Sequence, residues 1–328
     1  TACTDEPVIG RFSSSNTRDQ AVGFRVALFL GAVDDQVRYM DDLQVGDYVA
    51  YKPDTAEDYS LSSTYSGYSS DQTISQENLS WRVLSINDDG TVDLISSAPT
   101  SKDIYLKGAL GYNNGVYLLN DISAKLYSNN SLGVTARSLT IEDIEEGMNE
   151  AGIEYVQSYS DSDVPYGETK TYTLSSYRYY PNLYAQENGS GINTTTTKTD
   201  GIGQSDSYYT SPTTETYSQA DSNGLTVTQT YYNRSMNSSY YDNSTFYNLI
   251  HNAGRSYWLA SRYVNTLASN AYFGLRNVYG SYLIGSSLFG SHDNNNSHNN
   301  RLRPVVSLKS NIKLGSGDGK SSGTAYQI

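Results

Sequence analysis

The sequence has few of the residue types on which disulfide-rich, metal-binding and membrane-spanning proteins depend. Cys3 is the only cysteine among 328 residues, so neither an internal disulfide nor a cysteine-based zinc site can form. The longest apolar run, 21–33, contains Arg25 and is too short to cross a bilayer as a helix. It lacks a basic leader and lies too far into the chain for a signal peptide. We therefore expect no membrane span in this chain.

Positive charge is the second deficit, because 22 Lys and Arg stand against 35 Asp and Glu and leave a net charge of -13. Binding of nucleic-acid phosphates needs clustered Lys and Arg, so we expect no nucleic-acid partner. The motif HExxH and a phosphate-binding loop are also absent. The sequence therefore predicts no enzyme and no cofactor.

Histidine is scarce as well, with only His251, His292 and His298 in the chain. His292 and His298 could bind a metal together with Asp293, but an Asn-rich loop orients metal ligands poorly. We expect no metal site.

Tyrosine is the residue in excess, at 32 residues against 6 Phe and 2 Trp. Its ring supplies contact area with a polar end and little side-chain entropy, and recognition surfaces combine it with Ser, Gly and Asn. The alternative is that the tyrosines simply cover a polar, β-rich protein that faces water.

We divide the chain into an N-terminal segment, residues 1–40, a main domain, residues 41–314, and a C-terminal tail, residues 315–328. GFRVALFL at 23–30 resembles a buried strand and repeats the pattern of RLRPVVSL at 301–308. The N-terminal segment is therefore either the tail of an upstream copy of the same kind of domain or a strand that docks onto a sheet. The stretch at about 157–245, rich in Tyr, Ser, Thr, Asn and Gly, predicts a long loop insertion in the main domain.

The main domain begins with strand patterns. VGDYVAYKP predicts a short strand that Pro53 ends at Tyr51. LSWRVLSINDDGTVDLIS predicts a hairpin that turns at Asp89-Gly90, and this turn also explains the neighbouring acids Asp88 and Asp89.

Two helices are expected next. NNGVYLLNDISAKLYSN places Val116, Leu119, Ile122 and Leu126 on one face. LTIEDIEEGMNEAG predicts a helix that Thr140 caps and Gly152 stops, with Ile141, Ile144, Met148 and Ala151 along one side. Its acids Glu142, Asp143, Glu145 and Glu146 are better explained by a solvated helix start than by a metal or catalytic cluster.

The segment 256–308 alternates between two kinds of sequence. Trp258–Ala260, Phe273–Arg276 and Leu302–Leu308 are expected to be sheet and core, whereas GSYLIGSSLFGS has Gly280, Gly285 and Gly290 at a five-residue spacing that matches neither helix nor strand. We expect short extended pieces interrupted by turns. The residues expected to face outward and bind ligand share no chemical theme: Asn265, Asn270, Tyr272, Asn277, Tyr279, Tyr282, Ile284, Ser286, Phe289, Ser291, Asp293, Asn294, His298 and Asn299. A binding surface needs no such theme, whereas a catalytic site does.

The frame WLASR, FGLR and RLRPVVSL, with WRVL upstream, resembles C-type-lectin-fold proteins of bacteria and phages. It is most similar to Firmicutes surface or prophage proteins whose last segment resembles the variable region of diversity-generating retroelements. In that family, Asn codons of a template are randomised, and every outward residue named above belongs to the set of residues so produced. The resemblance covers about 41–314.

The resemblance implies an α+β fold of C-type-lectin type, a mixed sheet with two flanking helices and a long loop insertion. The N-terminal strands and the last strand share a sheet, and the final loops form an exposed ligand face. The calcium-binding triplets of animal C-type lectins are absent, and so is the cysteine pair of formylglycine-generating enzymes. The implied protein is therefore non-enzymatic, and calcium-dependent sugar binding is not expected.

These observations predict a ligand-binding surface protein, an adhesin or receptor-binding module that is extracellular, at a cell surface or on a virion. Its partner would be a protein or glycan on a host or neighbouring cell, and a homo-oligomer stays open. On this interpretation HDNNNSHNN, 292–300, is the last display loop, although a merely solvated hairpin loop would have the same composition. The alternative function is a structural subunit of an extracellular filament or virion.

Overall fold

The computed structural model describes residues 38–39, 42–161, 164–172, 189–190, 225–290, 296–309 and 311–328. All of them belong to the unit Arg38–Ile328. The predictions for 23–30 and for much of the expected insertion lie outside the described residues.

A five-stranded sheet is built from early segments of the chain and from its last long strand. Its strands, in spatial order, are β2 (Tyr48–Val49), β5 (Trp81–Ile86), β6 (Val92–Ser96), β19 (Pro304–Leu308) and β8 (Ala136–Ser138). β5 and β6 form the expected hairpin, and Gly90 takes a positive φ of 80° in its turn. β19 lies antiparallel to β6, which confirms that early strands and the last long strand share a sheet.

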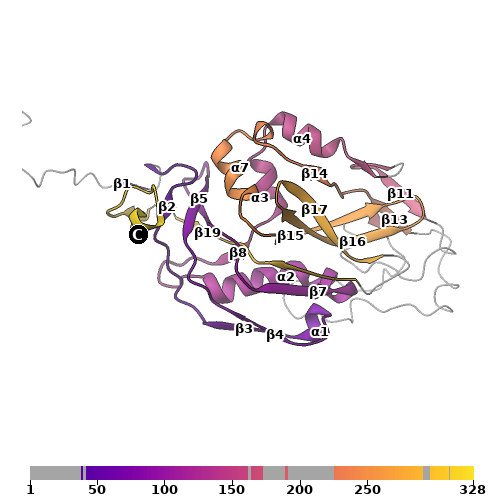
Figure 1. The fold of residues 1–328 in the computed structure, drawn as a ribbon, viewed down its shortest axis with the longest axis horizontal. Coiled ribbons are helices and arrows are strands. Elements are labelled where there is room, and N and C mark those ends of the chain that lie inside the picture. Colours follow the sequence, from indigo (N-terminus) through magenta and orange to yellow (C-terminus); the bar gives the residue numbers. More distant parts are fainter. Residues whose placement is uncertain are drawn as a thin grey trace, which may run out of the picture. The chain divides into compact units, whose positions relative to one another are not determined.

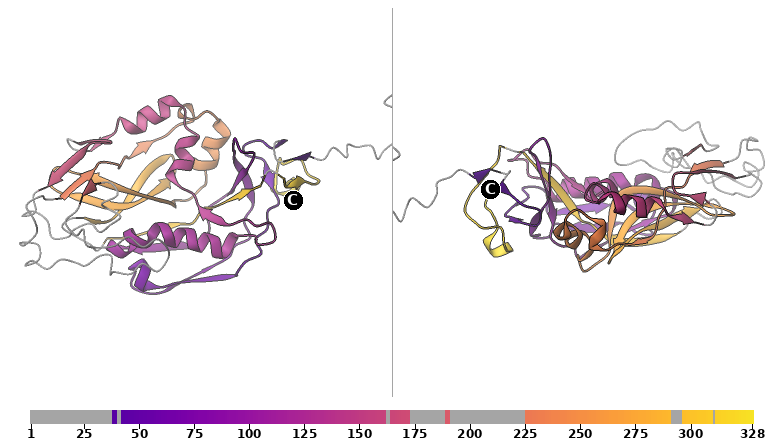
Figure 2. Two further views of the ribbon diagram at one scale, coloured as in Figure 1. Left: turned by 180° about the vertical axis from the view of Figure 1, so that it is seen from behind. Right: turned by 90° about the horizontal axis from the view of Figure 1, so that it is seen from above.

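The C-terminal residues extend this sheet at β2. Tyr326 accepts a hydrogen bond from the N–H of Ala50 and donates its own N–H to the carbonyl of Tyr48. In both views of Figure 2 the C-terminus lies beside the five-stranded sheet. The residues expected to be a tail thus add backbone hydrogen bonds to the domain.

A six-stranded sheet carries most of the segment expected to hold ligand contacts. Its strands, in spatial order, are β14 (Arg234–Ser235), β17 (Tyr282–Gly290), β16 (Ala271–Tyr279), β15 (Tyr257–Thr266), β18 (Ser297–Arg301) and β7 (Asp103–Lys107). β15, β16 and β17 run antiparallel as a meander, whereas β18 meets β15 in parallel.

The expectation of short pieces interrupted by turns was therefore wrong for β17, which is one strand of nine residues. Of the three spaced glycines, only Gly280 lies in a turn. A Cβ at Gly285 would collide with the ring of Tyr263, and one at Gly290 would crowd the ring of Tyr272. The spacing of the last two glycines thus reflects aromatic rings lying across the sheet rather than chain reversals.

Smaller sheets complete the strand inventory of the described residues. They pair β3 (Asp58–Leu61) with β4 (Gln72–Ser75), β9 (Ser160–Asp161) with β10 (Val164–Pro165), β11 (Thr169–Tyr172) and β12 (Gly189–Ser190) with β13 (Leu225–Thr228), and β1 (Arg38–Tyr39) with β20 (Lys313–Leu314). The short helical turns are α1 (Ser63–Ser66), η4 (Ser238–Tyr240) and η5 (Ser322–Thr324).

The long helix α2 (Gly108–Tyr127) covers one face of the six-stranded sheet. Its apolar stripe was predicted correctly, since Leu119, Ile122 and Leu126 are buried and Val116 packs against the same core. Gly115 lets the helix approach the sheet closely, because a Cβ there would collide with the side chain of Leu275.

The second expected helix is two helices, α3 (Ile141–Glu146) and α4 (Glu150–Gln157). Thr140 caps α3 as predicted, but Gly152 lies inside α4 and Ala151 is exposed, so both of those expectations were wrong. The break falls at Gly147, where a Cβ would collide with the ring of Phe246, and the side chain of Asn149 restarts the helix by accepting the N–H of Gly152. A tertiary contact therefore sets the break.

The other face of the six-stranded sheet is covered by α3, α4 and α7 (Ser244–His251), as Figure 1 shows. Neighbours on one strand divide between the two cores: Trp258 packs with α2, whereas Tyr257 and Leu259 pack with the group of α3 and α7. This alternation is that of a strand buried on both faces. The α+β class expected from the sequence is confirmed.

Candidate functional site

The end of the β16–β17 hairpin carries the largest exposed aromatic side chains of the described residues. Tyr279 is 66% exposed and Tyr282 is 44% exposed, and the two lie directly opposite each other across the hairpin. Only Gly280 and Ser281 connect them, with Gly280 at a φ of 57°, which suits a two-residue hairpin turn. Two rings are thus presented side by side at the tip of one hairpin.

Further residues share their face of the sheet. Side chains alternate between faces along a strand, so the cross-strand pairs Asn277 with Ile284 and Leu275 with Ser286 continue the face of the two tyrosines. Leu275 lies under α2, and Ile284 and Ser286 are half-buried. Helix α2 therefore covers one portion of this face and leaves the portion near the turn open to solvent.

The turn itself is fixed to the rest of the domain through its backbone. The carbonyl of Ser281 accepts the N–H of Met236 at 2.8 Å, and the carbonyl of Gly280 lies 3.1 Å from Nδ1 of His251. The Met236 side chain is buried, and α7 ends at His251. The two exposed tyrosines therefore flank a turn whose backbone is hydrogen-bonded to other elements of the domain.

His251 holds this turn as a neutral ring. Its pKa is lowered from the ordinary 6.5 to about 4, mainly by burial; the hydrogen bond to the Gly280 carbonyl opposes this effect, and the positive charge of Arg303 adds to it. A carbonyl can only accept, so Nδ1 carries the proton and donates to Gly280, and Nε2 accepts from the hydroxyl of Tyr241 at 2.8 Å. Both ring nitrogens are used, so His251 is a structural residue.

The opposite face of the same hairpin is core. Val278 and Leu283 lie opposite each other across the hairpin and are fully buried against the cluster of α3 and α7. The hairpin thus has one face that holds it in place and one face that is free to contact a partner.

The structure gathers five of the predicted ligand-binding residues on this face. They are Asn277, Tyr279, Tyr282, Ile284 and Ser286. The prediction that Asn277 is exposed was wrong, because it is buried and its side chain accepts a hydrogen bond from Ser286 Oγ at 3.1 Å. Asn277 therefore orients Ser286. The four others form what we call the hairpin face.

Phe289 was also wrongly expected to face outward. Its ring stacks on Phe273 with centroids 4.7 Å apart and meets Tyr112 edge-on, inside the core under α2. It lies where β17 carries an irregularity in its pairing with β16, so the simple alternation of the strand does not predict its side.

Three predicted residues lie at the far end of the same strands, away from the hairpin turn. Asn265 pairs with Tyr272 across β15 and β16, and Asn270 lies in the connection between these strands. The side chain of Asn265 is already bound, since it donates to Asp161 at 2.8 Å and accepts from Gln229 at 3.2 Å. This group is separate from the hairpin face.

The remaining predicted residues lie on β18 or outside the described residues. Asn299 donates to Asp103 on β7 at 2.7 Å, and burial lowers the pKa of the half-buried His298. The strand β18 takes up 297–301, so the end of the expected display loop is sheet. Ser291, Asp293 and Asn294 lie outside the described residues.

A cleft lies elsewhere, between the β5–β6 turn and the start of α3. It measures about 680 Å³ and includes six carboxylates in its lining, those of Asp88, Asp89, Asp93, Asp143, Glu146 and Asp242. Arg137 is the only base in the lining.

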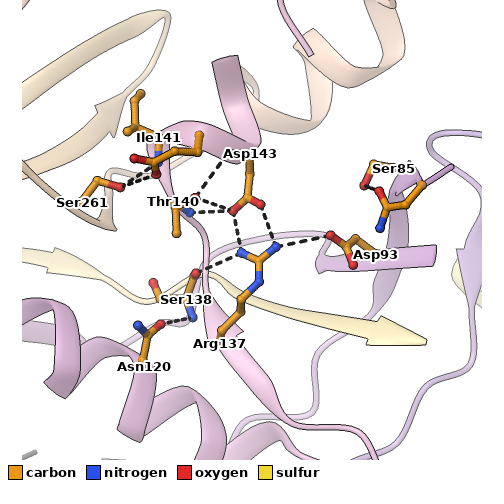
Figure 3. Close-up of polar contacts among 11 residues, drawn as sticks. Ser85, Asp93, Asn120, Arg137, Ser138, Thr140, Ile141, Asp143 and Ser261 are labelled. Atoms are coloured by element: carbon orange, nitrogen blue, oxygen red, sulfur yellow. Dashed lines mark hydrogen bonds and ion pairs between the residues drawn. The ribbon is translucent and has the colours of Figure 1, made fainter. Parts of the chain in front are cut away.

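Arg137 is bound by two of these acids, as Figure 3 shows. Its two terminal nitrogens bind the two oxygens of Asp143 at 2.6 and 2.7 Å, and Nη2 also lies 3.3 Å from Asp93. Burial alone would lower the pKa of Arg137, but the bonds to Asp143 and the charge of Asp93 outweigh burial and raise it.

Asp143 also closes a capping box with Thr140, whose N–H it accepts at 2.8 Å. Asp143 therefore stabilises the helix start, as the sequence predicted, and through Arg137 it also links the helix to β8 and to Asp93 on β6.

The residues that hold the hairpin face in place carry no signal in the sequence. The partners of its turn carbonyls, His251 and Met236, lie far away along the chain, and a sequence pattern does not reveal such partners. The one available signal is the Gly280-Ser281 pair between two tyrosines, which is a turn pattern.

Two general properties bear on the kind of site. Among the described residues, no three His, Cys, Asp or Glu side chains lie close enough together to hold a metal ion. The helices formed by those same residues are all too short or too polar to cross a membrane.

Comparison of the chain with family models, with curated proteins and with solved structures gave no match.

Proposed function

We propose that the chain is a ligand-binding protein of an extracellular surface, and that its ligand contacts the hairpin face of Tyr279, Tyr282, Ile284 and Ser286. The partner is a protein or glycan on a host or neighbouring cell. The proposal narrows the expected contact region of 265–300 to the end of one hairpin.

One observation carries this proposal: two large aromatic side chains are exposed on a turn whose backbone is bonded to the core. Exposed Tyr rings cost free energy in water and contribute contact area when a partner covers them. The rigid support keeps the entropy cost of binding low, since few backbone angles need to be fixed. Function on short connections held by a rigid scaffold is a common arrangement.

The composition of the face fits recognition better than catalysis. It offers two tyrosines, an isoleucine and a serine, none of which is a strong acid, base or activated nucleophile. Tyr and Ser together supply apolar area and adaptable hydrogen bonds, which is how binding surfaces are composed.

We also propose that the domain belongs to the C-type-lectin-like proteins and that its hairpin face varies between copies of the gene. Two features support this: the strands with WRVL and RLRPVVSL share a sheet, and helices flank the sheets. A second sequence from the same locus tests it. Differences should fall at Tyr279, Tyr282, Ile284 and Ser286, and should spare Val278 and Leu283 on the opposite face.

The binding proposal is tested with the double variant Tyr279→Ser/Tyr282→Ser. Wild type and variant are compared on a glycan array and on intact bacterial cells by flow cytometry. The matched control is Ile86→Ser, which removes a 40% exposed side chain at the end of β5, on the other hairpin.

We expect the double variant to lose at least about tenfold in affinity, because each buried aromatic contact at an interface contributes on the order of 1–2 kcal/mol. The control should bind as the wild type does. Binding that survives in the double variant would contradict the proposal.

A further inference from the structure

Arg276 is a buried cation on the inner side of β16. Its neighbours Leu275 and Asn277 lie on the same face of the sheet as Tyr279 and Tyr282. The side chain of Arg276 therefore points to the opposite face. Only 4% of its surface is exposed. Arg276 is therefore not part of the hairpin face, and its buried charge must be satisfied by other groups.

Most of its hydrogen-bonding capacity is unused. The guanidinium donates through Nη2 to the carbonyl of Thr230 and lies over the ring of Tyr232, 4.3 Å from the centroid. Nε and Nη1 are buried and have no acceptor in the described part of the chain. Three of the five N–H groups of the fork belong to these two nitrogens.

Arg303 shows how the same fold satisfies a buried arginine that is purely structural. It too is fully buried and lies over a tyrosine ring, that of Tyr257 at 4.9 Å. Its Nε and Nη2 donate to the carbonyl of Ser96, and its Nη1 donates to Ile250 and Tyr257. Each nitrogen of Arg303 has an acceptor, whereas two nitrogens of Arg276 have none among the residues that the structure describes.

No carboxylate balances Arg276 at contact distance among the described residues. Glu145 is nearby but accepts the hydroxyl of Tyr232 at 2.7 Å, and Glu142 accepts Ser261 Oγ at 3.2 Å. A buried guanidinium without a contacting counter-charge and with free donors destabilises the folded state. A bound anion would satisfy both the charge and the free donors of such a group.

The surroundings of Arg276 are rich in tyrosine hydroxyls. Burial raises the pKa values of Tyr166, Tyr231, Tyr232 and Tyr263, and the positive charge of Arg276 lowers each of them in part. These phenols therefore stay protonated at neutral pH, and the hydroxyl of Tyr232 is already donated to Glu145. Tyr263 also fills the space above Gly274 and Gly285, so little room is left for a large ligand.

We propose that Arg276 binds a small monovalent anion, of the size of a halide or a formate-like carboxylate, through its Nε–H and Nη1–H groups. Charge-assisted hydrogen bonds from a guanidinium are strong where water is excluded. The bound anion neutralises the buried charge and stabilises the inner side of β16. This site is independent of the hairpin face, since it lies on the opposite side of the sheet.

The experiment uses the full chain in gluconate buffer, because gluconate is too large to enter. Bromide or formate then replaces gluconate up to 100 mM at constant ionic strength, and the melting temperature is measured. We expect a rise of about 3 °C for a small anion that binds the folded state. A rise with both anions indicates a general small-anion site, and a rise with formate alone indicates a carboxylate site.

Variants assign the effect to Arg276. In Arg276→Gln the rise should disappear, whereas the control Arg262→Gln should keep it, because Arg262 on the neighbouring strand donates to the carbonyls of Tyr112 and Asn113 under α2. The same rise in Arg276→Gln, or none in the wild type, would overturn the proposal.

A crystal of the wild type soaked in bromide decides the matter if Arg276→Gln does not fold. An anomalous peak within hydrogen-bonding distance of Nε and Nη1 is expected for a halide site. For a site that responds to formate alone, formate density at the same place is expected. A water molecule there instead of an anion would show that the proposal is wrong.

Discussion

Two hairpins of this protein satisfy their turns in different ways. In the β5–β6 hairpin, the turn groups bond to one another: Asn87 donates to Thr91 through both backbone and side chain, and Thr91 donates to Asp89. In the β16–β17 hairpin, the turn carbonyls of Gly280 and Ser281 accept hydrogen bonds from His251 and Met236, which belong to other elements of the domain.

The two hairpins also differ in how much of their side-chain surface is buried. Both faces of β6 are buried, whereas one face of the β16–β17 hairpin near its turn is open and carries two tyrosines. Because this turn is held through its backbone, the side chains beside it are not needed to hold it in place. This difference is why we assign ligand binding to the second hairpin and a structural role to the first.

The strongest test of the two-faced hairpin compares neighbouring residues of β17. Leu283→Ala removes a fully buried side chain and should lower the free energy of unfolding by about 3 kcal/mol, because a cavity is left in the core. Ile284→Ala, one position along and on the open face, should cost under about 1 kcal/mol. Urea denaturation of both variants measures the difference, and equal losses would show that the hairpin does not have one structural face.

His251 supplies the next largest effect, and it depends on pH. The unfolded chain takes up a proton at His251 near pH 6.5, whereas the folded state does so only near its pKa of about 4. The unfolded state therefore binds more protons in this window, and the stabilising contribution, complete above pH 6.5, is lost as the pH falls to about 4. The loss is at most about 3 kcal/mol.

The variant His251→Asn isolates this contribution. Its amide can still donate to the carbonyl of Gly280, but it does not titrate. We expect the difference in stability between wild type and variant to shrink as the pH falls from 6.5 toward 4, measured by urea denaturation at each pH. A difference that stays constant over this range would contradict the neutral, buried state of His251.

The smallest expected effects concern the two turn glycines. Gly280→Ala and Gly90→Ala each place a Cβ on a residue with positive φ, 57° and 80°, and each should cost about 1 kcal/mol. Space does not limit Gly280, where nothing lies within 4 Å of a Cβ. Gly280→Asn should therefore cost less than Gly280→Ala, because Asn tolerates the left-handed region. Thermal melting of the three variants checks this order.

The sequence predicted those elements of the fold that depend on local patterns. The β5–β6 hairpin follows from Asp89-Gly90 between apolar runs, the apolar stripe of α2 from its spacing, and the start of α3 from Thr140 and Asp143. The break between α3 and α4 could not be predicted, because it depends on the ring of Phe246, about a hundred residues away, packing at Gly147.

The candidate site was predicted incompletely for a related reason. Composition pointed to the right segment, but the side on which a residue faces depends on strand register. Tyr279 and Tyr282 were predicted to face outward, and both are exposed. Phe289 and the spacing of Gly285 required knowledge of the pairing irregularity and of Tyr263 across the sheet.

The central claim is that the hairpin face can change without unfolding the domain. The most direct test replaces Tyr279, Tyr282, Ile284 and Ser286 together by Ser, Asn, Thr and Asn, and measures melting temperature and binding to intact cells on the same preparation. We predict a melting temperature within about 3 °C of the wild type and a loss or change of the cells bound. A large drop in melting temperature with the same cells still bound would contradict the account.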